Sequence, residues 1–364
     1  MDFTSLGVPE PLAAALAARG ITEPTEIQRE VIPAACTGEN LIGEAPTGTG
    51  KTLAYLLPAL MRIDPAVRAA QVLVLAPTHE LAMQIAGAAR DLIQAAGLSV
   101  GVQALIGGAN VQRQIDALKK KPALIVGSAP RIVELHRLRK LKLQEVRLCV
   151  LDEFDRLLDK QHSAEVRAVL HLLPRERQML FLSATAAAAA VHAAEELCAL
   201  RIIRAAVQET TCENYYHIVP FRDKIKAVQK LTRRLPIRRG LVFVGRSFDA
   251  EKAAEKLQYE GIRVAALLGG ERRDQRRAAL NAIRTGRVQL LLSTDLAARG
   301  LDIADVDYVV QVDLPEDVRT YRHRAGRTAR AGKEGTVISL VDAKEVERLK
   351  ALAVRMKLDL KKIN

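Results

Sequence analysis

The chain has 364 residues, a length that suits two ordinary domains, and 49% of them are hydrophobic, enough for a core in each half. Its net charge of +13 favours a polyanionic partner. No stretch is apolar and uncharged for long enough to span a bilayer, and the N-terminus lacks the pattern of a signal peptide. The four cysteines show no paired spacing, which argues against a disulfide or zinc framework. We therefore expect a cytoplasmic protein without a membrane partner.

The positive charge is distributed unevenly along the chain. Residues 1–207 contain 23 basic and 21 acidic residues, whereas residues 208–364 contain 32 and 21. Aromatic residues make up only 3% and tryptophan is absent, which disfavours a nucleic-acid grip based on base stacking. The pattern predicts contacts mainly to a phosphate backbone, without strong sequence specificity.

Short apolar runs alternate with helical patterns through both halves. The predicted strands are 72–76, 123–127, 148–151 and 179–182 in the first half, and 241–244, 263–267, 288–292 and 308–312 in the second. Such alternation indicates an α/β fold with a mostly parallel sheet in each half, flanked by helices. A polar stretch near 206–214 suggests domains at 1–207 and 208–364, and residues 345–364 are predicted to form one amphipathic helix.

Residues 45–52, Ala-Pro-Thr-Gly-Thr-Gly-Lys-Thr, lie between an apolar segment and an apolar helix. This is the strand–loop–helix context of a phosphate-binding loop. Glycines let backbone N–H groups approach phosphates, and the helix N-terminus adds partial positive charge. We expect Lys51 to reach the β- and γ-phosphates of ATP and Thr52 to meet Mg²⁺. The expected phosphate contacts are Thr47, Gly48, Thr49, Gly50, Lys51 and Thr52.

Acidic residues follow the apolar run 148–151 directly, in the order Asp-Glu-Phe-Asp. Ligands of open α/β sheets bind beyond the carboxyl ends of the strands. Asp152 is therefore placed to hold Mg²⁺, and Glu153 to orient or deprotonate the attacking water. An Asp-Glu pair alone would usually be a solvated helix start, but the strand before it and the upstream phosphate loop favour catalysis.

Further motifs accompany these two along the chain. They are Gly20–Gln28, Pro77–Leu81, Gly107–Gly108, Ser128–Arg131, Ser183–Thr185, Leu241–Ser247, Leu268–Gly270 with Arg273 and Arg276, Ser293–Asp302, and Tyr321–Arg330. In this order, the motifs from Phe3 to Gly332 resemble those of the DEAD-box RNA helicases of superfamily 2. The resemblance covers nearly the whole chain and implies two tandem RecA-like domains, with the ATP site on residues 1–207 and the later helicase motifs on 208–364.

The resemblance implies roles for several residues. Gln28 would bond the adenine edge and Thr25 would support its loop, while Phe3, Ile21 and Asp295 would complete the nucleotide site. Arg324 and Arg327 would be catalytic arginines reaching the γ-phosphate, since a basic patch in this motif order is better explained so than as a solvated helix face. Coupling of hydrolysis to strand separation would involve Asp155, Ser183, Thr185 and His323.

The expected RNA contacts occur in both halves of the chain. They are Pro77, Thr78, Gly107, Gly108, Ser128, Arg131, Gly269, Gly270, Arg276 and Thr294. The chain departs from the family pattern at Ile21, His79, Phe154, Arg273 and Ala329.

The resemblance predicts an RNA-stimulated ATPase that unwinds short RNA duplexes locally or remodels RNA–protein complexes. It further suggests a monomer with a ribosomal or other ribonucleoprotein substrate. Two alternatives stay open. One is an ATP-gated RNA clamp or scaffold that does not unwind. The other is a superfamily 2 DNA helicase or translocase, against which the adenine-reading motif argues.

Overall fold

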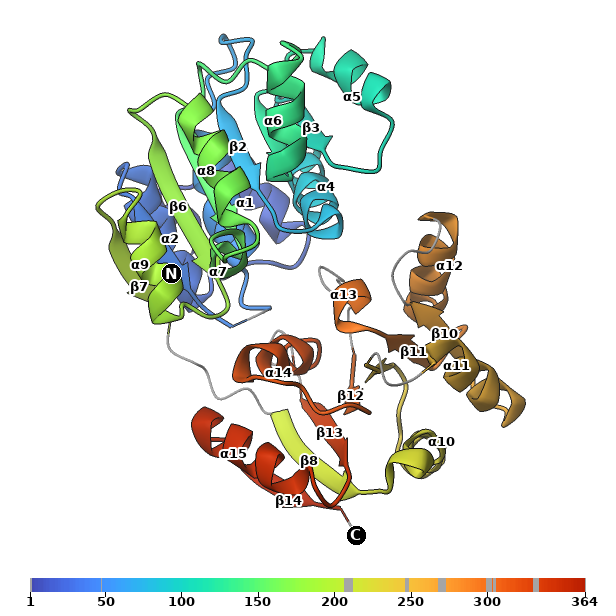
Figure 1. Cartoon of the computed structure of the whole chain (residues 1–364). Helices are drawn as coiled ribbons and strands as arrows, with labels where there is room; N and C mark the ends of the chain where they lie inside the picture. The colour runs from blue at the N-terminus through green and yellow to red at the C-terminus, as the bar shows by residue number, and fades with distance from the viewer. Residues whose placement is uncertain are drawn as a thin grey trace. The chain divides into compact units, whose positions relative to one another are not determined.

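The computed structural model describes residues 2–46, 48–205, 212–245, 249–267, 273–298, 303, 306–329 and 334–363. The chain divides into two compact units, unit 1 (Met1–Val207) and unit 2 (Gln208–Asn364). Figure 1 shows each unit as a sheet flanked by helices. The junction at 206–211 lies outside the described residues.

Unit 1 contains a seven-stranded sheet in the order β3-β4-β2-β5-β6-β1-β7, with every pairing parallel. Its strands are β1 (Leu41–Glu44), β2 (Val72–Leu75), β3 (Val102–Leu105), β4 (Leu124–Gly127), β5 (Leu148–Asp152), β6 (Gln178–Ser183) and β7 (Arg201–Arg204). Its helices are η1 (Thr4–Leu6), α1 (Glu10–Ala17), α2 (Glu26–Cys36), α3 (Lys51–Met61), α4 (His79–Ala95), α5 (Val111–Leu118), α6 (Ala129–Arg137), α7 (Phe154–Leu157), α8 (Ser163–Leu172) and α9 (Ala188–Glu195).

Unit 2 also contains a seven-stranded parallel sheet, in the order β10-β11-β9-β12-β13-β8-β14. Its strands are β8 (Cys212–Ile218), β9 (Gly240–Phe243), β10 (Val264–Leu267), β11 (Leu290–Ser293), β12 (Tyr308–Gln311), β13 (Gly335–Val341) and β14 (Leu360–Lys362). Its helices are η2 (Phe221–Asp223), α10 (Lys224–Arg234), α11 (Ala250–Tyr259), α12 (Arg273–Arg284), α13 (Asp295–Ala298), α14 (Val318–Ala325) and α15 (Val346–Met356). Numbered from its own first strand, this order repeats that of unit 1.

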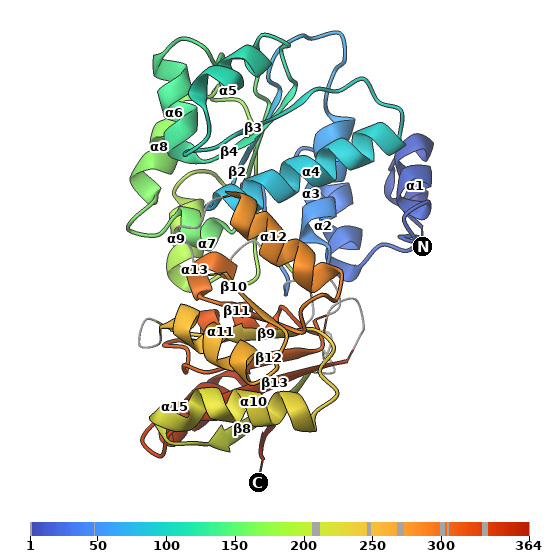
Figure 2. The same ribbon diagram turned by 90° about the vertical axis from the view of Figure 1, so that its right-hand side faces the viewer.

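Each sheet is covered on both faces, as Figure 2 shows from a second side. Alternate residues of β2 join opposite cores: Val72 and Val74 pack with α1–α4, whereas Leu73 and Leu75 pack with α6–α9. In unit 2, Val242 faces α10 and α11, and Leu241 faces α12, α14 and α15. Burial on both faces explains why the strands are continuous apolar runs. The predicted parallel α/β fold is confirmed.

The prediction of one helix over residues 345–364 was wrong. Helix α15 ends at Met356, and Lys357 adopts a left-handed conformation with φ of 55°. The chain then forms β14, which pairs in parallel with β8 at the edge of the sheet. Apolar spacing in the tail fits a helix, but it does not show that the last residues pair with β8 as an edge strand.

Candidate active site

The phosphate loop connects β1 to α3 in unit 1. Gly50 lies at the N-terminus of α3 with φ of +86°, and a Cβ atom there would be 2.3 Å from Nε2 of Gln28. Both the left-handed backbone and this close approach require glycine. Gly48 is also left-handed, with φ of +85°. The predicted loop conformation is therefore present, while Thr47 lies outside the described residues.

Lys51 is the first residue of α3, and its ammonium group is folded onto the loop itself. Nζ donates hydrogen bonds to the carbonyl oxygens of Ala45 at 2.5 Å and Pro46 at 2.7 Å. The Thr49 hydroxyl also donates to Pro46, at 2.7 Å. These bonds compensate the lysine charge inside the loop. Phosphate oxygens of a nucleotide would have to replace the two carbonyl partners of Lys51.

Helix α2 is tied to the phosphate loop by Gln28, which we predicted to bond adenine, and by Thr25, which we predicted to support the loop of Gln28. Gln28 is 1% exposed, its Nε2 donates to the Gly50 carbonyl at 3.0 Å, and its Oε1 accepts from the Thr25 backbone N–H at 2.9 Å. The Thr25 hydroxyl donates to the Thr49 carbonyl at 2.7 Å. In this structure Gln28 uses a donor and its acceptor within the protein, so it fixes the loop.

Phe3 and Ile21, both predicted nucleotide contacts, pack against the core of unit 1. Phe3 is 2% exposed inside that core, and Ile21 packs against it while partly exposed. Contact of Phe3 with a base would require a change in this burial, and its predicted role stays a prediction. The predicted contact of Ile21 with the nucleotide stays a prediction.

Asp152 and Glu153 come at the carboxyl end of β5. In the parallel register Asp152 lies beside Leu182 of β6, and Ser183 at the end of β6 lies beside Glu44 at the end of β1. The phosphate loop therefore starts at the same edge of the sheet as the acids. Glu153 is left-handed, with φ of 52°, an uncommon conformation that holds the chain in a sharp turn after the strand.

The Asp152 carboxylate is 5% exposed and has fixed partners on both oxygens. Oδ1 accepts from the Glu153 backbone N–H at 3.0 Å, and Oδ2 accepts from the Tyr55 hydroxyl at 2.8 Å. Burial, with a contribution from the Glu153 charge, raises the pKa of Asp152 to about 6, although Tyr55 and Lys51 oppose the rise. Burial also raises the pKa of Tyr55 well above its usual range, and the Asp152 charge adds to this.

The donors at this edge fit a magnesium ion that also binds nucleotide phosphates. Within the described residues no group of three or more His, Cys, Asp or Glu side chains could hold a metal by itself. Mg²⁺ commonly takes one or two protein oxygens plus phosphate oxygens and water. The Thr52 hydroxyl at the start of α3 and the Asp152 carboxylate are oxygen donors of that kind.

Three of the predicted coupling residues lie together in unit 1. The Thr185 hydroxyl donates to Oδ2 of Asp155 at 3.0 Å, and the Thr185 backbone N–H donates to the Ser183 hydroxyl oxygen at 3.2 Å. Asp155 is 7% exposed and Ser183 is fully buried. The segment after β6 is thus bonded to the segment after β5. Their predicted part in coupling stays a prediction.

The predicted RNA contacts of unit 1 follow three neighbouring strands. Pro77 and Thr78 follow β2, Gly107 and Gly108 follow β3, and Ser128 follows β4. Because β3, β4 and β2 are adjacent and parallel, these residues lie at one edge of the sheet.

Two polar residues at this edge already have partners. Thr78 caps α4 by accepting from the Leu81 N–H at 3.2 Å. Arg131 is only 7% exposed and pairs with Glu134 at 3.0 Å. Contact of the Arg131 guanidinium with RNA would require a change in its burial.

In unit 2, Arg276 and Thr294 lie close to one another. Arg276 donates through Nη2 to the Ala297 carbonyl at 2.9 Å, and the Thr294 hydroxyl accepts from the Ala297 N–H at 3.3 Å. Both residues therefore meet at α13. Gly269 and Gly270 lie outside the described residues.

Arg324 is buried within unit 2, at 3% exposure. Its Nε and Nη2 donate to the two carboxylate oxygens of Asp295, each at 2.7 Å, and Nη1 donates to the Asp313 carbonyl at 2.6 Å. The guanidinium also lies 5.0 Å from the centre of the Phe243 ring. This forked pair holds Asp295, and contact of Arg324 with a phosphate would require a change in it. The predicted catalytic role of Arg324 stays a prediction.

Arg327 lies one turn further along the chain and differs from Arg324. It is partly exposed, and its Nε donates to the backbone carbonyl of His323 at 3.3 Å. Of the two predicted arginines, Arg327 is therefore the better placed to reach a ligand. The predicted roles of Arg327 and His323 stay predictions.

Comparison with known proteins agrees with this geometry. Residues 25–193 match the DEAD/DEAH box helicase family model, and residues 223–332 match that of the helicase conserved C-terminal domain. DEAD-box ATP-dependent RNA helicase CshC of Bacillus cereus is 42% identical over 341 residues, covering 93% of this chain and 87% of the relative. The chain belongs to the DEAD-box helicase family.

Two further comparisons cover almost the whole chain. A Bacillus subtilis protein, "Probable ATP-dependent RNA helicase YfmL", is 40% identical over 347 residues, covering 94% of this chain and 91% of the relative. Saccharomyces cerevisiae Dbp5 bound to RNA and ADP BeF3 has a TM-score of 0.90 at 28% identity, covering 100% of this chain and 95% of that chain. The expected pair of tandem RecA-like domains is confirmed. No helix in the described part of the chain is long and apolar enough to cross a membrane.

The motif that gives the DEAD-box family its name has Phe154 in this chain. Phe154 is fully buried, and its ring meets that of Phe181 edge-to-face, with centroids 5.7 Å apart and an interplanar angle of 76°. It joins the apolar core on the α6–α9 side of the sheet. The larger side chain thus adds to the core, while Asp152 and Asp155 keep their polar partners.

Two other departures from the DEAD-box pattern also have a visible setting. The imidazole of His79 lies against Gly107, where an added Cβ would be 3.0 Å from Nε2. Ala329 has φ of 52°, a conformation that favours the glycine usual at this position. The side chain of Arg273 lies outside what the structure describes.

Tyr55 is the residue of this site that the sequence motifs did not indicate. A signal was present, because a tyrosine stands in the otherwise apolar run Leu53–Leu60, one turn after Lys51. A buried phenol usually finds a hydrogen-bond partner. Nothing in the motif itself identifies Asp152 as that partner.

Proposed function

We propose that this chain is an ATP-dependent RNA helicase that unwinds short RNA duplexes locally or remodels RNA–protein complexes. In this proposal, hydrolysis is coupled to closing and opening of two domains, residues 1–207 and 208–364. The observation that carries it is the edge of the unit 1 sheet, where Lys51 at the start of α3 and the acids Asp152 and Glu153 after β5 come together. The DEAD-box family membership supports the RNA substrate.

Residues of unit 1 bind and orient ATP. The backbone N–H groups of the phosphate loop and Lys51 hold the phosphates, once Lys51 has exchanged the carbonyls of Ala45 and Pro46 for phosphate oxygens. Thr52 and Asp152 would hold Mg²⁺, which supplies positive charge to the phosphate oxygens. Glu153 accepts a proton from, or orients, the attacking water.

Residues of unit 2 complete the reaction. Arg327 provides a positive charge that stabilises the transferring phosphoryl group, a role that contributes roughly 10³–10⁵ in rate where arginine fingers are known. Arg324 acts as a positioning residue, because its forked pair holds the Asp295 carboxylate in place for the nucleotide. Hydrolysis is consequently slow until RNA binding brings the two domains together.

RNA is bound mainly through its phosphate backbone, which gives little sequence discrimination. The excess of basic residues in 208–364 supports this proposal. We propose that the chain acts as a monomer in the cytoplasm, on a ribosomal or other ribonucleoprotein substrate.

Strand separation of a short RNA duplex tests this function. Wild-type protein with ATP should release the labelled strand, and Lys51→Ala should not, because the phosphates lose their cationic partner. Glu153→Gln should bind ATP and RNA and then hydrolyse slowly, by roughly 10²–10⁴-fold, which traps RNA. Tight ATP-dependent RNA binding by wild type without strand separation would contradict unwinding and would identify an ATP-gated clamp.

A further inference from the structure

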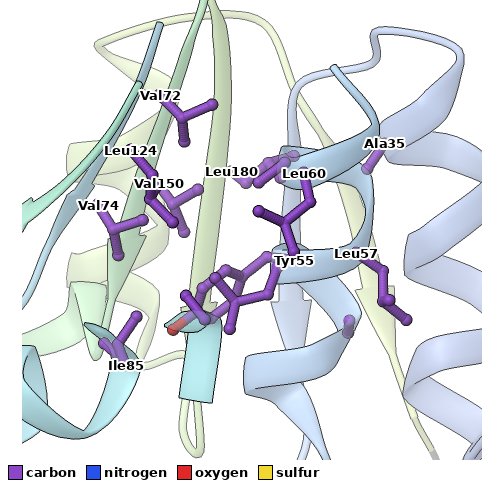
Figure 3. Close-up of a cluster of buried hydrophobic side chains, with 14 of the residues drawn as sticks. Ala35, Tyr55, Leu57, Leu60, Val72, Val74, Ile85, Leu124, Val150 and Leu180 are labelled. Carbon is purple, nitrogen blue, oxygen red and sulfur yellow. The ribbon is translucent and has the colours of Figure 1, made fainter. Parts of the chain in front are cut away.

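Tyr55 connects the core of unit 1 to the candidate magnesium site. It belongs to α3, one helical turn beyond Lys51, so the two residues share a face of the helix. Its side chain is fully buried. Figure 3 shows the ring among the side chains of Val74, Val150 and Ile85, with the hydroxyl oxygen at its far end.

This packing fixes the position of the phenol hydroxyl. Val74 and Val150 come from adjacent central strands and Ile85 comes from α4, and all three belong with Tyr55 to one buried apolar cluster. A close-packed ring has few rotamers available. The oxygen is therefore held at the boundary between the apolar core and the polar edge of the sheet.

The hydroxyl meets Asp152 on one side of its carboxylate. Tyr55 donates to Oδ2 at 2.8 Å, while the Glu153 backbone N–H donates to Oδ1 at 3.0 Å. Rotation of a carboxylate about its terminal bond is otherwise broad. With one donor on each oxygen the carboxylate plane is fixed, and each oxygen keeps acceptor capacity for a further ligand.

We propose that Tyr55 is a positioning residue for magnesium–nucleotide binding, holding the Asp152 carboxylate in the orientation that serves the metal. This inference rests on the proposed function, because it takes Asp152 as a magnesium ligand. In this role Tyr55 acts through the Asp152 carboxylate and is not itself a ligand of the metal. Hydrogen-bonding partners behind metal ligands typically change metal affinity or activity by roughly 10–100-fold when they are removed.

Equilibrium binding of a fluorescent, non-hydrolysable ATP analogue to the full chain, with Mg²⁺ and with chelator, tests the proposal without hydrolysis. Tyr55→Phe keeps the ring and removes the donor. It should lower the gain in affinity that Mg²⁺ gives by roughly 10–100-fold and leave binding in chelator unchanged. A merely structural role would lower the melting temperature without changing the magnesium gain, and that result would overturn the proposal.

A matched control comes from unit 2. The Tyr215 hydroxyl donates to Oε2 of Glu213 at 3.0 Å, also a phenol–carboxylate bond, but on the surface. Tyr215→Phe should leave the magnesium gain unchanged. A reduction equal to that of Tyr55→Phe would show a non-specific effect and contradict the proposal.

A double-mutant cycle tests whether Tyr55 acts through Asp152. In an Asp152→Asn background, Tyr55→Phe should cause no further loss of the magnesium gain. An additional loss would place the action of Tyr55 elsewhere and overturn the proposal. A wild-type protein that shows no magnesium gain would contradict the proposed function itself, whereas a normal wild type with an unaffected Tyr55→Phe variant would contradict the Tyr55 role alone.

Discussion

Units 1 and 2 share one strand order but carry different chemistry at the carboxyl edges of their sheets. Unit 1 ends its strands with the phosphate loop and two acids, whereas unit 2 places a buried arginine against Asp295. The basic side chains at these two edges differ in how easily a ligand can reach them. Lys51 is held by two backbone carbonyls that a phosphate can replace, and Arg324 is held by a carboxylate and is nearly inaccessible.

The shared strand order determines the edge of each sheet at which ligands bind, but it does not determine which ligands bind there. Parallel strands deliver their carboxyl ends to one edge in both units. The side chains that follow those ends then give unit 1 a phosphate loop beside two acids and unit 2 a buried arginine paired with Asp295. Substitutions of these side chains test whether units 1 and 2 have separate roles.

The largest expected effect comes from separating the two arginines of unit 2. Arg327→Ala should reduce RNA-stimulated ATP hydrolysis by roughly 10³–10⁵-fold with unfolding unchanged. Arg324→Ala should instead destabilise unit 2 by roughly 1–3 kcal/mol, because it removes the buried guanidinium that bonds Asp295 and the Asp313 carbonyl. Steady-state ATPase rates and denaturant unfolding of both variants measure this difference. Equal stability of the two variants would contradict the positioning role of Arg324.

A smaller effect concerns Asp152 in unit 1 without nucleotide. Its pKa is raised from 3.8 to about 6, so the folded state retains a proton that the unfolded chain releases. The wild-type free energy of unfolding should therefore fall, relative to Asp152→Asn, as pH rises from about 4 through 6. Asp152→Asn should be more stable by roughly 1–3 kcal/mol at pH 7.5, with the difference lost near pH 4. Urea unfolding at several pH values measures it, and a constant difference would refute the raised pKa.

The smallest effect should come from Ala329 in unit 2. At φ of 52° its Cβ is strained, and it is 8% exposed. Ala329→Gly removes that strain and should stabilise the protein by about 1 kcal/mol, less the greater chain entropy of glycine. Ala109→Gly in the loop before α5 offers a comparison without this φ. Equal destabilisation of both variants in thermal unfolding would show that Ala329 is not strained.

Eight of the strands and the ATP-binding loop could be predicted because their signals are local, whereas β3, β7, β8, β13 and β14 were not predicted. Continuous apolar runs marked the buried strands, and the glycines with Lys51 marked the loop. The partners of Arg324 could not, since Asp295 lies 29 positions earlier and only the sheet brings them together. The burial of Phe3 could not be predicted either, because a motif gives no measure of burial.

Other misses came from contacts that cross between elements. Gln28 carries the amide expected of an adenine reader, yet its bond to Gly50 appears only when α2 packs beside the loop. Nothing in the sequence around Lys357 indicates that this residue adopts a left-handed conformation. The apolar run around Tyr55 indicates a buried phenol. Its partner Asp152 lies 97 positions away, so the sequence does not identify it.

RNA dependence of ATP hydrolysis tests most directly whether the two units divide the reaction as proposed. The measurement is the steady-state hydrolysis rate of the full chain with increasing single-stranded RNA, for wild type, Lys51→Ala and Arg327→Ala. We expect slow hydrolysis by the wild-type chain alone, strong stimulation of that chain by RNA, and no stimulation of either variant. A wild-type rate indifferent to RNA, or an Arg327→Ala variant stimulated like wild type, would contradict it.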